Sequence, residues 1–486
     1  MITFIDNLLN SITMYRLLLY YLSFLLVVAF IYSIFGILPF GPIPLLFSAG
    51  ILTGVCYVTN KLFGRFFKVQ TNYESLYITA LILTFIITPA KNINGVIFLV
   101  IAATLAMASK YILNIRGKHI FNPAAIAVVI TGFTIHGYAS WWIGTLAMFP
   151  FTLVGVFIVR KIRRFDLVFY FFVAIIISVI LSHHFLINVF IDSPILFFAF
   201  VMLSEPLTTP PTAFLQSLYG GFVGILFTPL HIGVFFTAPE IALVIGNVFS
   251  YIVSPKEKLI LILKEKLKLT NDIYDFVFTT NAKLNFRPGQ YLEWTLGYPH
   301  VDSRGNRRYF TISSSPTEED VRIGIKFPEL KASGFKKEML SMKIGSRITA
   351  SQLSGDFTLP QNKTQKLVFI AGGIGVTPFR SMIKYLIDTG EKRDMVLIYS
   401  DKTKDVMVYK NIFEEAIKKL GIKIIYYESE KSGHITSEFI RKEIPDFRTR
   451  KFYLSGSHGM VTGFEEVLHA LKLPKKQIKV DYFPGF

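Results

Sequence analysis

The sequence predicts a bundle of membrane-spanning helices over residues 1–254, fused to a water-soluble region of strands and helices over residues 255–486. The first reason is composition, because 52% of the residues are hydrophobic and only 17% are charged, whereas soluble domains carry about 25% charged residues. The second reason is charge distribution: residues 1–254 hold 12 of the 51 Lys and Arg residues and 6 of the 33 Asp and Glu residues. The third is the abrupt end of the apolar sequence at Pro255, which Lys256 and Glu257 follow. These numbers exclude a purely soluble protein and a disordered chain.

Apolar runs close to the length needed to cross a bilayer recur throughout the first part. We expect ten spans, at residues 17–38, 42–60, 74–88, 94–113, 122–137, 141–160, 166–182, 187–203, 213–230 and 236–253. Basic residues cluster after the second, fourth, sixth and tenth spans, and loops rich in Lys and Arg face the cytoplasm. The pattern therefore predicts a multi-pass protein of the cell (inner or cytoplasmic) membrane, embedded in the lipid bilayer, with both termini in the cytoplasm. No cleaved signal peptide is expected.

Charge and cysteine content exclude several classes of site. We interpret the net charge of +18 as membrane topology and contact with anionic lipid, because no basic nucleic-acid-binding module is visible and no nucleic-acid partner is expected. The single cysteine, Cys56, excludes a disulfide framework, a four-cysteine iron–sulfur cluster and a cysteine-built zinc site. The histidines lack the spacing of stacked haem ligands, so no metal site is expected.

Two proline motifs recur in the apolar part at nearly equal offsets. Thr88-Pro89 ends the third span as Ser204-Glu205-Pro206 ends the eighth, and Asn122-Pro123-Ala124 resembles Ala238-Pro239-Glu240, at offsets of 117 and 115–116 residues. This predicts an inverted repeat of five spans, and such repeats place sites at their interface, next to broken helices. The alternative is that proline only starts or ends helices there and that the acids stabilise helix N-termini. The candidate membrane site residues are Asn122, Pro123, Ser204, Glu205, Thr208, Thr209 and Glu240.

The soluble part changes pattern near residue 365. Residues 259–360 read as short alternating strands and contain Phe286-Arg287-Pro288-Gly289-Gln290-Tyr291 and Arg308-Tyr309-Phe310-Thr311-Ile312-Ser313-Ser314. From residue 366 a strand runs into Gly372-Gly373-Ile374-Gly375-Val376-Thr377-Pro378 and then an amphipathic helix. A glycine-rich turn between a strand and a helix lets the backbone approach a pyrophosphate. Further strands follow at 395–399, 423–427 and 452–454, the last before Ser455-Gly456.

These ordered motifs closely resemble the ferredoxin–NADP reductase superfamily over residues 259–486. The resemblance implies an FAD-binding antiparallel β-barrel of six strands over 255–362 and a Rossmann-like NAD(P)H-binding α/β domain over 363–486. It implies that Arg308 holds the FAD pyrophosphate, that Phe310 lies on the isoalloxazine and that Thr311 bonds the flavin edge where hydride arrives. Thr311, Ser455 and Phe486 are the expected catalytic residues. The other cofactor-binding residues expected are Tyr309, Ile312, Lys326, Ser333, Gly334, Phe335, Gly372, Gly373, Gly375, Thr377, Pro378, Ser400, Lys402, Gly456 and Phe483.

The segment after the second strand of the α/β domain bears on the choice of nucleotide. It reads Tyr399-Ser400-Asp401-Lys402, where Asp401 repels a 2′-phosphate and Lys402 attracts one. The balance favours NADH slightly over NADPH.

The apolar part has a looser resemblance over most of 40–254, carried by Asn122-Pro123-Ala124, Ser204-Glu205-Pro206-Leu207-Thr208 and Gly220-Gly221. It is similar to a family of membrane proteins shared by the sodium-pumping NADH:quinone reductase and the Rnf complex. That family carries flavin, and many members bind FMN covalently through Thr in a Ser-x-Ala-Thr motif after the fifth span. This chain has no such motif, which leaves a second, non-covalent flavin (FMN or riboflavin) or a quinone.

Together these patterns predict a membrane flavoprotein oxidoreductase. Hydride passes from cytoplasmic NAD(P)H to FAD, and single electrons continue into or across the membrane to a second flavin, a quinone or an outer-face electron acceptor. Two alternatives are a ten-span transporter or channel with a regulatory reductase, and an anchored FAD reductase of soluble acceptors. The sequence is also compatible with a homo-oligomer.

Overall fold

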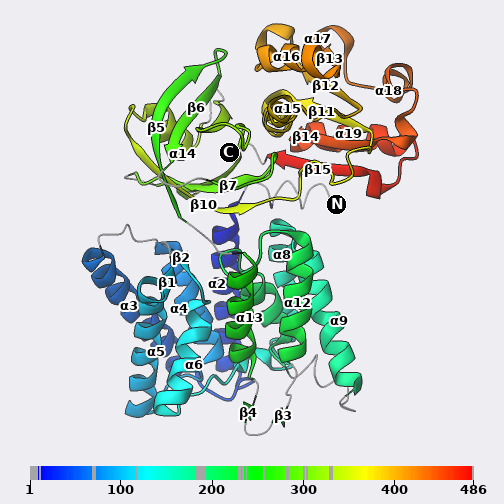
Figure 1. Cartoon of the computed structure of the whole chain (residues 1–486). Helices are drawn as coiled ribbons and strands as arrows, with labels where there is room; N and C mark the ends of the chain where they lie inside the picture. Colours follow the sequence, from blue (N-terminus) through cyan, green and yellow to red (C-terminus); the bar gives the residue numbers. More distant parts are fainter. Residues whose placement is uncertain are drawn as a thin grey trace. The chain divides into compact units, whose positions relative to one another are not determined.

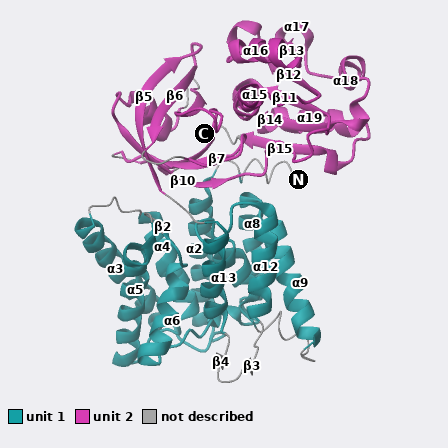
Figure 2. Cartoon of the chain, in the orientation of Figure 1, with its two compact units in different colours: residues 1–257 teal, residues 258–486 magenta. Residues whose placement is uncertain are grey.

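The chain forms two compact units, Met1–Glu257 and Lys258–Phe486 (Figure 2). The structure, a computed structural model, describes residues 9, 12–67, 73–115, 118–181, 193–227, 231–232, 235–236, 238–254, 258–280, 284–298, 301–302, 305–327 and 332–483. Phe486 lies outside the described residues, and of Phe483 only the backbone is described.

The N-terminal unit is helical (Figure 1). Three of its helices are long and apolar enough to cross a membrane: α2 (Met14–Ile34), α3 (Pro42–Phe66) and α5 (Ile93–Ile112). Five apolar helices are shorter: α4 (Tyr73–Ile86), α6 (Pro123–Ile135), α9 (Phe165–Leu181), α12 (Ala213–Phe227) and α13 (Pro239–Val253). Two short β-hairpins, β1 (Asn114–Ile115) with β2 (Lys118–His119) and β3 (His231–Ile232) with β4 (Phe235–Phe236), complete the unit. The expectation of ten spans stays a prediction.

Two of the expected spans are not continuous α-helices. The span at 141–160 is divided into η1 (Trp142–Gly144), α7 (Phe149–Thr152), η2 (Leu153–Gly155) and α8 (Val156–Ile162). The described part of the span at 187–203 consists of α11 (Ile195–Phe197) and a π-helix, η3 (Phe198–Leu203). These segments pack closely, because a Cβ on Gly144 would lie 2.4 Å from the Pro194 nitrogen. Tertiary packing of this kind overrides helical regularity, and apolar composition alone does not reveal it.

Local sequence explains where several helices begin. Proline occupies the first turn of α3, α6 and α13, where its missing N–H costs nothing. Asn92 caps α5 by accepting a hydrogen bond from the Gly95 amide at 2.9 Å. Cys56 is fully buried on α3, with its Sγ 3.9 Å from the Ala103 carbonyl of α5. The helices therefore enclose a core in which small side chains allow close contact.

The C-terminal unit begins with an antiparallel sheet of six strands in the order β8-β7-β10-β5-β6-β9. The two outer strands meet where the Ser313 amide donates to the Arg322 carbonyl at 2.8 Å. The interior is apolar and includes the fully buried Trp294 and Phe278. The strands are β5 (Leu259–Lys268), β6 (Ile273–Thr280), β7 (Tyr291–Thr295), β8 (Arg307–Thr311), β9 (Val321–Lys326) and β10 (Arg347–Ser354), and α14 (Gly334–Ser341) packs with them. The expected antiparallel sheet is confirmed.

A parallel sheet of five strands follows, in the order β13-β12-β11-β14-β15. Its strands are β11 (Leu367–Gly372), β12 (Met395–Asp401), β13 (Lys423–Glu428), β14 (Lys451–Ser457) and β15 (Ile478–Phe483). Helices lie on both faces: α15 (Thr377–Thr389), α16 (Lys410–Leu420), α17 (Ser429–Ser432), α18 (Ser437–Glu443) and α19 (His458–Ala470), with short turns η4 (Gly373–Val376), η5 (Lys404–Val406), η6 (Phe447–Thr449) and η7 (Lys475–Gln477). The strand order reverses between β11 and β14, and ligands of such sheets bind at the carboxyl ends of the strands at that point. The expected Rossmann-like domain is confirmed.

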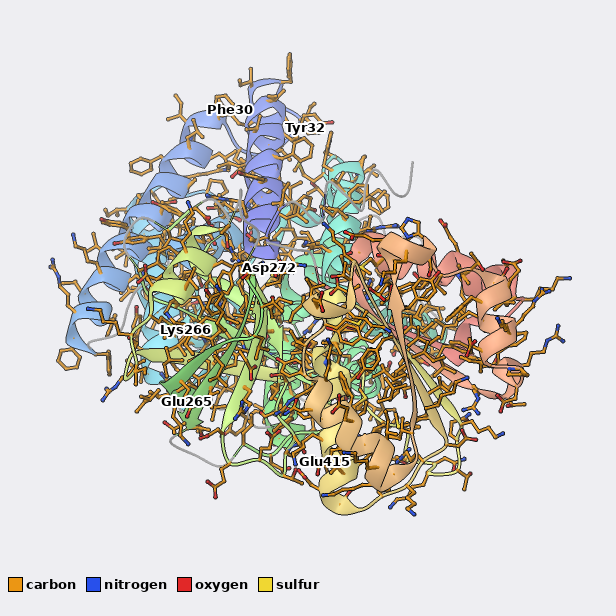
Figure 3. All side chains as sticks on the ribbon, turned by 90° about the horizontal axis from the view of Figure 1, so that it is seen from above. Phe30, Tyr32, Glu265, Lys266, Asp272 and Glu415 are labelled. Carbon is orange, nitrogen blue, oxygen red and sulfur yellow. The ribbon has the colours of Figure 1, made fainter. Side chains whose placement is uncertain are left out.

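Charged side chains cover the outer faces of the C-terminal unit. Figure 3 shows Glu265 and Lys266 projecting from β5, Asp272 in the turn before β6, and Glu415 on α16. Glu415 pairs with Lys419 at 2.7 Å on this exposed surface, where such a pair contributes little stability.

Candidate functional site

Three side chains from β8 and α14 gather on one face of the antiparallel sheet. Arg308 is 4% exposed and donates from Nη1 to the carbonyl oxygens of Gly305 (3.2 Å) and Arg307 (2.6 Å). Its guanidinium carbon lies 5.3 Å from the ring centre of Phe335, and the rings of Phe310 and Phe335 are 5.9 Å apart. The structure thus brings a buried cation and two aromatic rings together.

The alternate residues of β8 lie elsewhere, as a pleated strand requires. Tyr309 is 46% exposed and donates its hydroxyl to Glu293 at 2.8 Å. Ile312 belongs to the barrel core, and its amide donates to the Gln290 carbonyl. The Thr311 hydroxyl is buried and has no hydrogen-bond partner within the described part of the chain. The Tyr309 side chain is therefore separate from the Arg308 cluster, whereas Ile312, which follows β8, lies in the same apolar core as Phe335.

The start of α14 already binds a carboxylate. The Gly334 amide donates to Oδ2 of Asp302 at 2.8 Å, and the Ser333 hydroxyl accepts from the Lys336 amide at 3.3 Å. The N-terminal end of a helix favours an anion. A carboxylate thus occupies the helix start at which the resemblance implies the cofactor-binding residues Ser333 and Gly334, and sequence reasoning did not anticipate Asp302.

The glycine-rich turn, residues 372–376, lies at the carboxyl end of β11. The strand order of the parallel sheet reverses there, and we call this place the switch point. Gly373 has a positive φ of +55°, and a Cβ on Gly375 would lie 2.4 Å from the Ser455 carbonyl and 2.5 Å from Gly456. Thr377, at the first position of α15 and followed by Pro378, donates its hydroxyl to the Ile374 carbonyl at 3.2 Å. The expected residues Gly372, Gly373, Gly375, Thr377, Pro378, Ser455 and Gly456 are thus gathered at the carboxyl ends of β11 and β14.

Ser455, which lies next to the glycine-rich turn, has a hydroxyl group that makes no hydrogen bond within the described part of the chain. Its Oγ is fully buried and has no partner among the described residues. Buried hydroxyl groups without a partner are uncommon, and the same is true of Thr311 at the end of β8. Both therefore fit a site in which a bound molecule supplies the missing partner.

The second strand of the parallel sheet ends in an acidic group. Oδ1 of Asp401 accepts from the Lys402 amide at 2.9 Å, while Oδ2 is buried without a partner in the described part of the chain. Burial raises the pKa of the Asp401 carboxyl, and the Lys402 amide and the charge of Lys326 oppose that shift. Ser400 is buried next to Gly372 in the sheet, and Lys402 is exposed. Lys326 forms an ion pair with Asp272 at 3.3 Å, so it lies near Asp401 and not with the Arg308 cluster.

The candidate residues of the N-terminal unit form two groups. In the first, Asn122 caps α6, and its Nδ2 donates to Oε2 of Glu205 at 2.9 Å. Thr208 donates to the same oxygen at 3.3 Å, and Thr209 donates to the Glu205 carbonyl at 2.9 Å. The adjoining residues are Pro123, the first residue of α6, and Ser204, which donates to the Phe200 carbonyl at 2.7 Å.

Sequence reasoning missed two members of this first group. Oδ1 of Asn247 accepts a hydrogen bond from the backbone N–H of Asn122 at 2.8 Å. Nδ2 of Asn247 donates to the Tyr219 hydroxyl at 3.1 Å. Both residues are polar positions within apolar helices, α13 and α12. Buried polar groups in such helices face the bundle interior, and that rule could have found them.

Glu240 belongs to the second group. Its Oε2 accepts from the Trp141 indole at 2.8 Å, and the neighbouring Trp142 indole donates to the carbonyls of Thr84 (2.7 Å) and Ile87 (3.1 Å) at the end of α4. Glu240 precedes Asn247 by seven residues on α13, about 10 Å along the helix axis. The structure therefore separates Glu240 from Glu205, and the two tryptophans were not predicted.

Comparison with known proteins concerns the C-terminal half. Residues 369–466 match the family model described as "Oxidoreductase NAD-binding domain". Among curated relatives, flavohemoprotein A of Dictyostelium discoideum is 24% identical over 46% of this chain and 59% of its own length. The propane 2-monooxygenase reductase component of Rhodococcus jostii is 28% identical over 42% of this chain and 58% of its own length. The glycine betaine monooxygenase reductase subunit of Chromohalobacter salexigens is 24% identical over 41% of this chain and 57% of its own length. The chain thus spans little more than half the length of these relatives.

Solved structures with similarity include the ferredoxin-NADP+ reductase of Plasmodium falciparum with 2′P-AMP, at a TM-score of 0.40 and 21% identity over 47% of this chain and 97% of that chain. The FAD/NAD-binding domain of nitric oxide dioxygenase from Vibrio cholerae gives a TM-score of 0.41 and 20% identity over 46% and 98%.

Residues 369–466 are therefore an NAD-binding domain of the oxidoreductase type, and this domain follows a six-stranded antiparallel sheet. This match places the domain among oxidoreductases that bind a nicotinamide nucleotide.

Proposed function

We propose that the chain is a membrane flavoprotein oxidoreductase that uses cytoplasmic NAD(P)H and FAD and delivers single electrons into or across the membrane. The observation that carries this proposal is the glycine turn at the switch point, in the same compact unit as the Arg308 cluster. When bound, FAD accepts hydride from the nicotinamide and releases electrons one at a time. The chain supplies placement, charge and exclusion of water.

Specific residues fit these tasks. Arg308, held against Phe335, places a buried positive charge where a pyrophosphate needs it, and Phe310 offers an aromatic face beside it. The glycine turn and the start of α15 admit a second pyrophosphate close to the backbone. The buried hydroxyls of Thr311 and Ser455 would bond the flavin edge and the nicotinamide.

Asp401 supports NADH as the electron donor. An acidic group at the end of the second strand accepts a hydrogen bond from a ribose hydroxyl and repels a 2′-phosphate. The Oδ2 atom of Asp401 is buried and would lie 3.7 Å from a Cβ on Gly373, so it points towards the glycine turn. The exposed Lys402 is the weaker influence, because solvent screens its charge.

The N-terminal unit is proposed to contain ten spans as an inverted repeat, with both termini in the cytoplasm. Support comes from two proline-initiated helices, α6 and α13, each of which starts beside a carboxylate: the half-buried Glu205 and the buried Glu240. The Glu205 group is proposed to receive the electrons and the Glu240 group to lie towards the outer face. The acceptor is a non-covalent flavin (FMN or riboflavin), a quinone or an outer-face molecule, and two relatives named as monooxygenase reductases favour a reductase that serves an acceptor.

Cofactor content tests this function. The full chain, purified in mild detergent, should contain one FAD that NADH reduces, and Arg308→Ala should lose most of it. Arg347→Ala, at an exposed position of β10, is the matched control and should keep its flavin. Unchanged flavin in Arg308→Ala would overturn the assignment.

A second flavin reduced through the FAD would support electron entry into the membrane unit. Solute uptake that is indifferent to NADH would favour the transporter alternative.

A further inference from the structure

Five charged or polar side chains form a network between the two sheets of the C-terminal unit; we call Asp275, Glu318, Arg322, Arg380 and Tyr409 the interlobe network. Asp275, Arg380 and Tyr409 are buried, and Glu318 and Arg322 are half-buried. Arg380 of α15 forms a bidentate pair with Glu318, which precedes β9, with 2.9 Å between Nη2 and Oε1. Tyr409, just before α16, donates its hydroxyl to Asp275 of β6 at 3.0 Å. Arg322 of β9 contacts Asp275 at 3.2 Å. Arg380 and Tyr409, which belong to the part of the chain that forms the parallel sheet, therefore bind Glu318 and Asp275 of the antiparallel part.

The network bonds directly to the backbone that follows Thr311. Nη1 of Arg380 donates to the Ser313 carbonyl at 2.9 Å, and the neighbouring Ser381 hydroxyl donates to the Ser314 carbonyl at 2.6 Å. Ser313 lies two residues after Thr311. At the other end, Arg380 lies one turn after Thr377, which follows the glycine turn. A single helical turn of α15 thus connects the glycine turn, where NAD(P)H is proposed to bind, to the backbone beside the proposed flavin edge at Thr311.

The form of these contacts indicates a role in geometry more than in stability. A buried ion pair contributes little net stability, because desolvation offsets its attraction. A bidentate Arg–carboxylate pair does fix orientation, because two parallel hydrogen bonds allow one arrangement. Reaction rates respond strongly to such placement, and a displacement of about 1 Å costs up to about 100-fold.

We propose that Arg380, held by Glu318, is a positioning residue for hydride transfer: it sets the separation between the glycine turn, where NAD(P)H is proposed to bind, and the end of β8 at Thr311, which is proposed to contact the flavin edge. The inference rests on the proposed function. In the reaction NAD(P)H loses a hydride to become NAD(P)⁺ and the flavin takes it up, so the network changes no bond and acts only through distance. Loss of the network should slow this step and leave binding of both cofactors nearly intact.

The test uses the full chain in detergent with bound FAD, mixed rapidly with NADH. Arg380→Lys keeps the positive charge but cannot form the two parallel hydrogen bonds of the guanidinium group. Glu318→Gln keeps the shape of the side chain but removes its negative charge. We expect the limiting rate of flavin reduction to fall about 10- to 100-fold in each, with the apparent Kd for NADH within about threefold and flavin content unchanged. The kinetic isotope effect with deuterated NADH should become more temperature-dependent.

Glu415→Gln is the matched control, because the same substitution there breaks an exposed pair with Lys419 on α16 (Figure 3). It should leave the rate unchanged. If Arg380→Lys and Glu318→Gln reduce flavin at the wild-type limiting rate, the inference is wrong, even where their melting temperature falls. If wild-type protein with bound FAD is reduced by neither NADH nor NADPH, the proposed function fails instead.

Discussion

Substitution of Gly324 in β9 by alanine tests the contact between the two sheets, because it adds a single methyl group at that contact. A Cβ at this position would lie 2.6 Å from the Tyr409 hydroxyl, 2.9 Å from Cγ2 of Thr377 and 3.3 Å from Cδ1 of Ile374. Ordinary contact begins at 3.4 Å. In Gly324→Ala the Tyr409 hydroxyl must therefore retreat by about 0.8 Å and the Thr377 methyl by about 0.5 Å (3.4 less 2.6 and 2.9).

These neighbours cannot simply rotate away. The Tyr409 hydroxyl is bonded to Asp275, and Thr377 begins α15 with its own hydroxyl on the Ile374 carbonyl. The cheaper response is a shift of the whole glycine turn away from β9. A shift of this size is expected to lower the limiting rate of flavin reduction about 10- to 100-fold.

Rapid mixing with saturating NADH measures that rate, with flavin content and melting temperature recorded alongside. Gly463→Ala on α19 is the control, because its methyl group enters open space. Wild-type reduction by flavin-replete Gly324→Ala would refute the reasoning.

Three further predictions follow from other contacts. Asp401→Ser should raise the ratio of kcat/KM for NADPH to that for NADH at least about tenfold, since it removes a buried anion from beside the ribose site; an unchanged ratio would place the nucleotide elsewhere. A hydrogen bond from Arg450 and a second one from Lys366 hold the pKa of Asp446 at about 2. This carboxylate therefore stabilises the fold above its unfolded pKa of 3.8, and its contribution to stability is lost as the pH falls through about 2. Asp446→Asn should therefore lower the melting temperature at pH 6 and have little effect near pH 2, measured by flavin release on heating. Trp141→Phe should lower the free energy of unfolding in detergent by about 1–3 kcal/mol, because it leaves Glu240 without its indole donor; an equal loss in Trp141→His, which can still donate, would argue that ring packing matters instead.

Sequence patterns predicted four of the five strands of the parallel sheet, because each of the four is a short apolar run that ends in a recognisable turn. β11, for example, was expected at 366–371 and occupies Leu367–Gly372. The same reasoning predicted that the glycine turn and Ser455 lie close together, because the carboxyl ends of parallel strands meet at one edge of the sheet. It could not place Asp302 or Arg380, whose partners Gly334 and Glu318 lie 32 and 62 residues away.

In the N-terminal unit, the proline motifs predicted Asn122 and Glu205 as candidates, and the structure joins them by a hydrogen bond. Asn247 and Tyr219 complete that group; their place in apolar helices marks them as interior residues, but only the structure shows which partners they bind. The breaks in the span at 141–160 were missed for a similar reason. Backbone approach at Gly144 determines them, and hydropathy does not record it.

The burial of Cys56 has a practical consequence for topology. Its thiol is inaccessible on α3 and the chain has no second cysteine, so a polar maleimide should leave the native protein unlabelled. A cysteine introduced singly into each loop would then report only on its own side of the membrane in intact cells. Ten spans require labelling to alternate from loop to loop, and the first pair of adjacent loops that label alike would show where a span is missing.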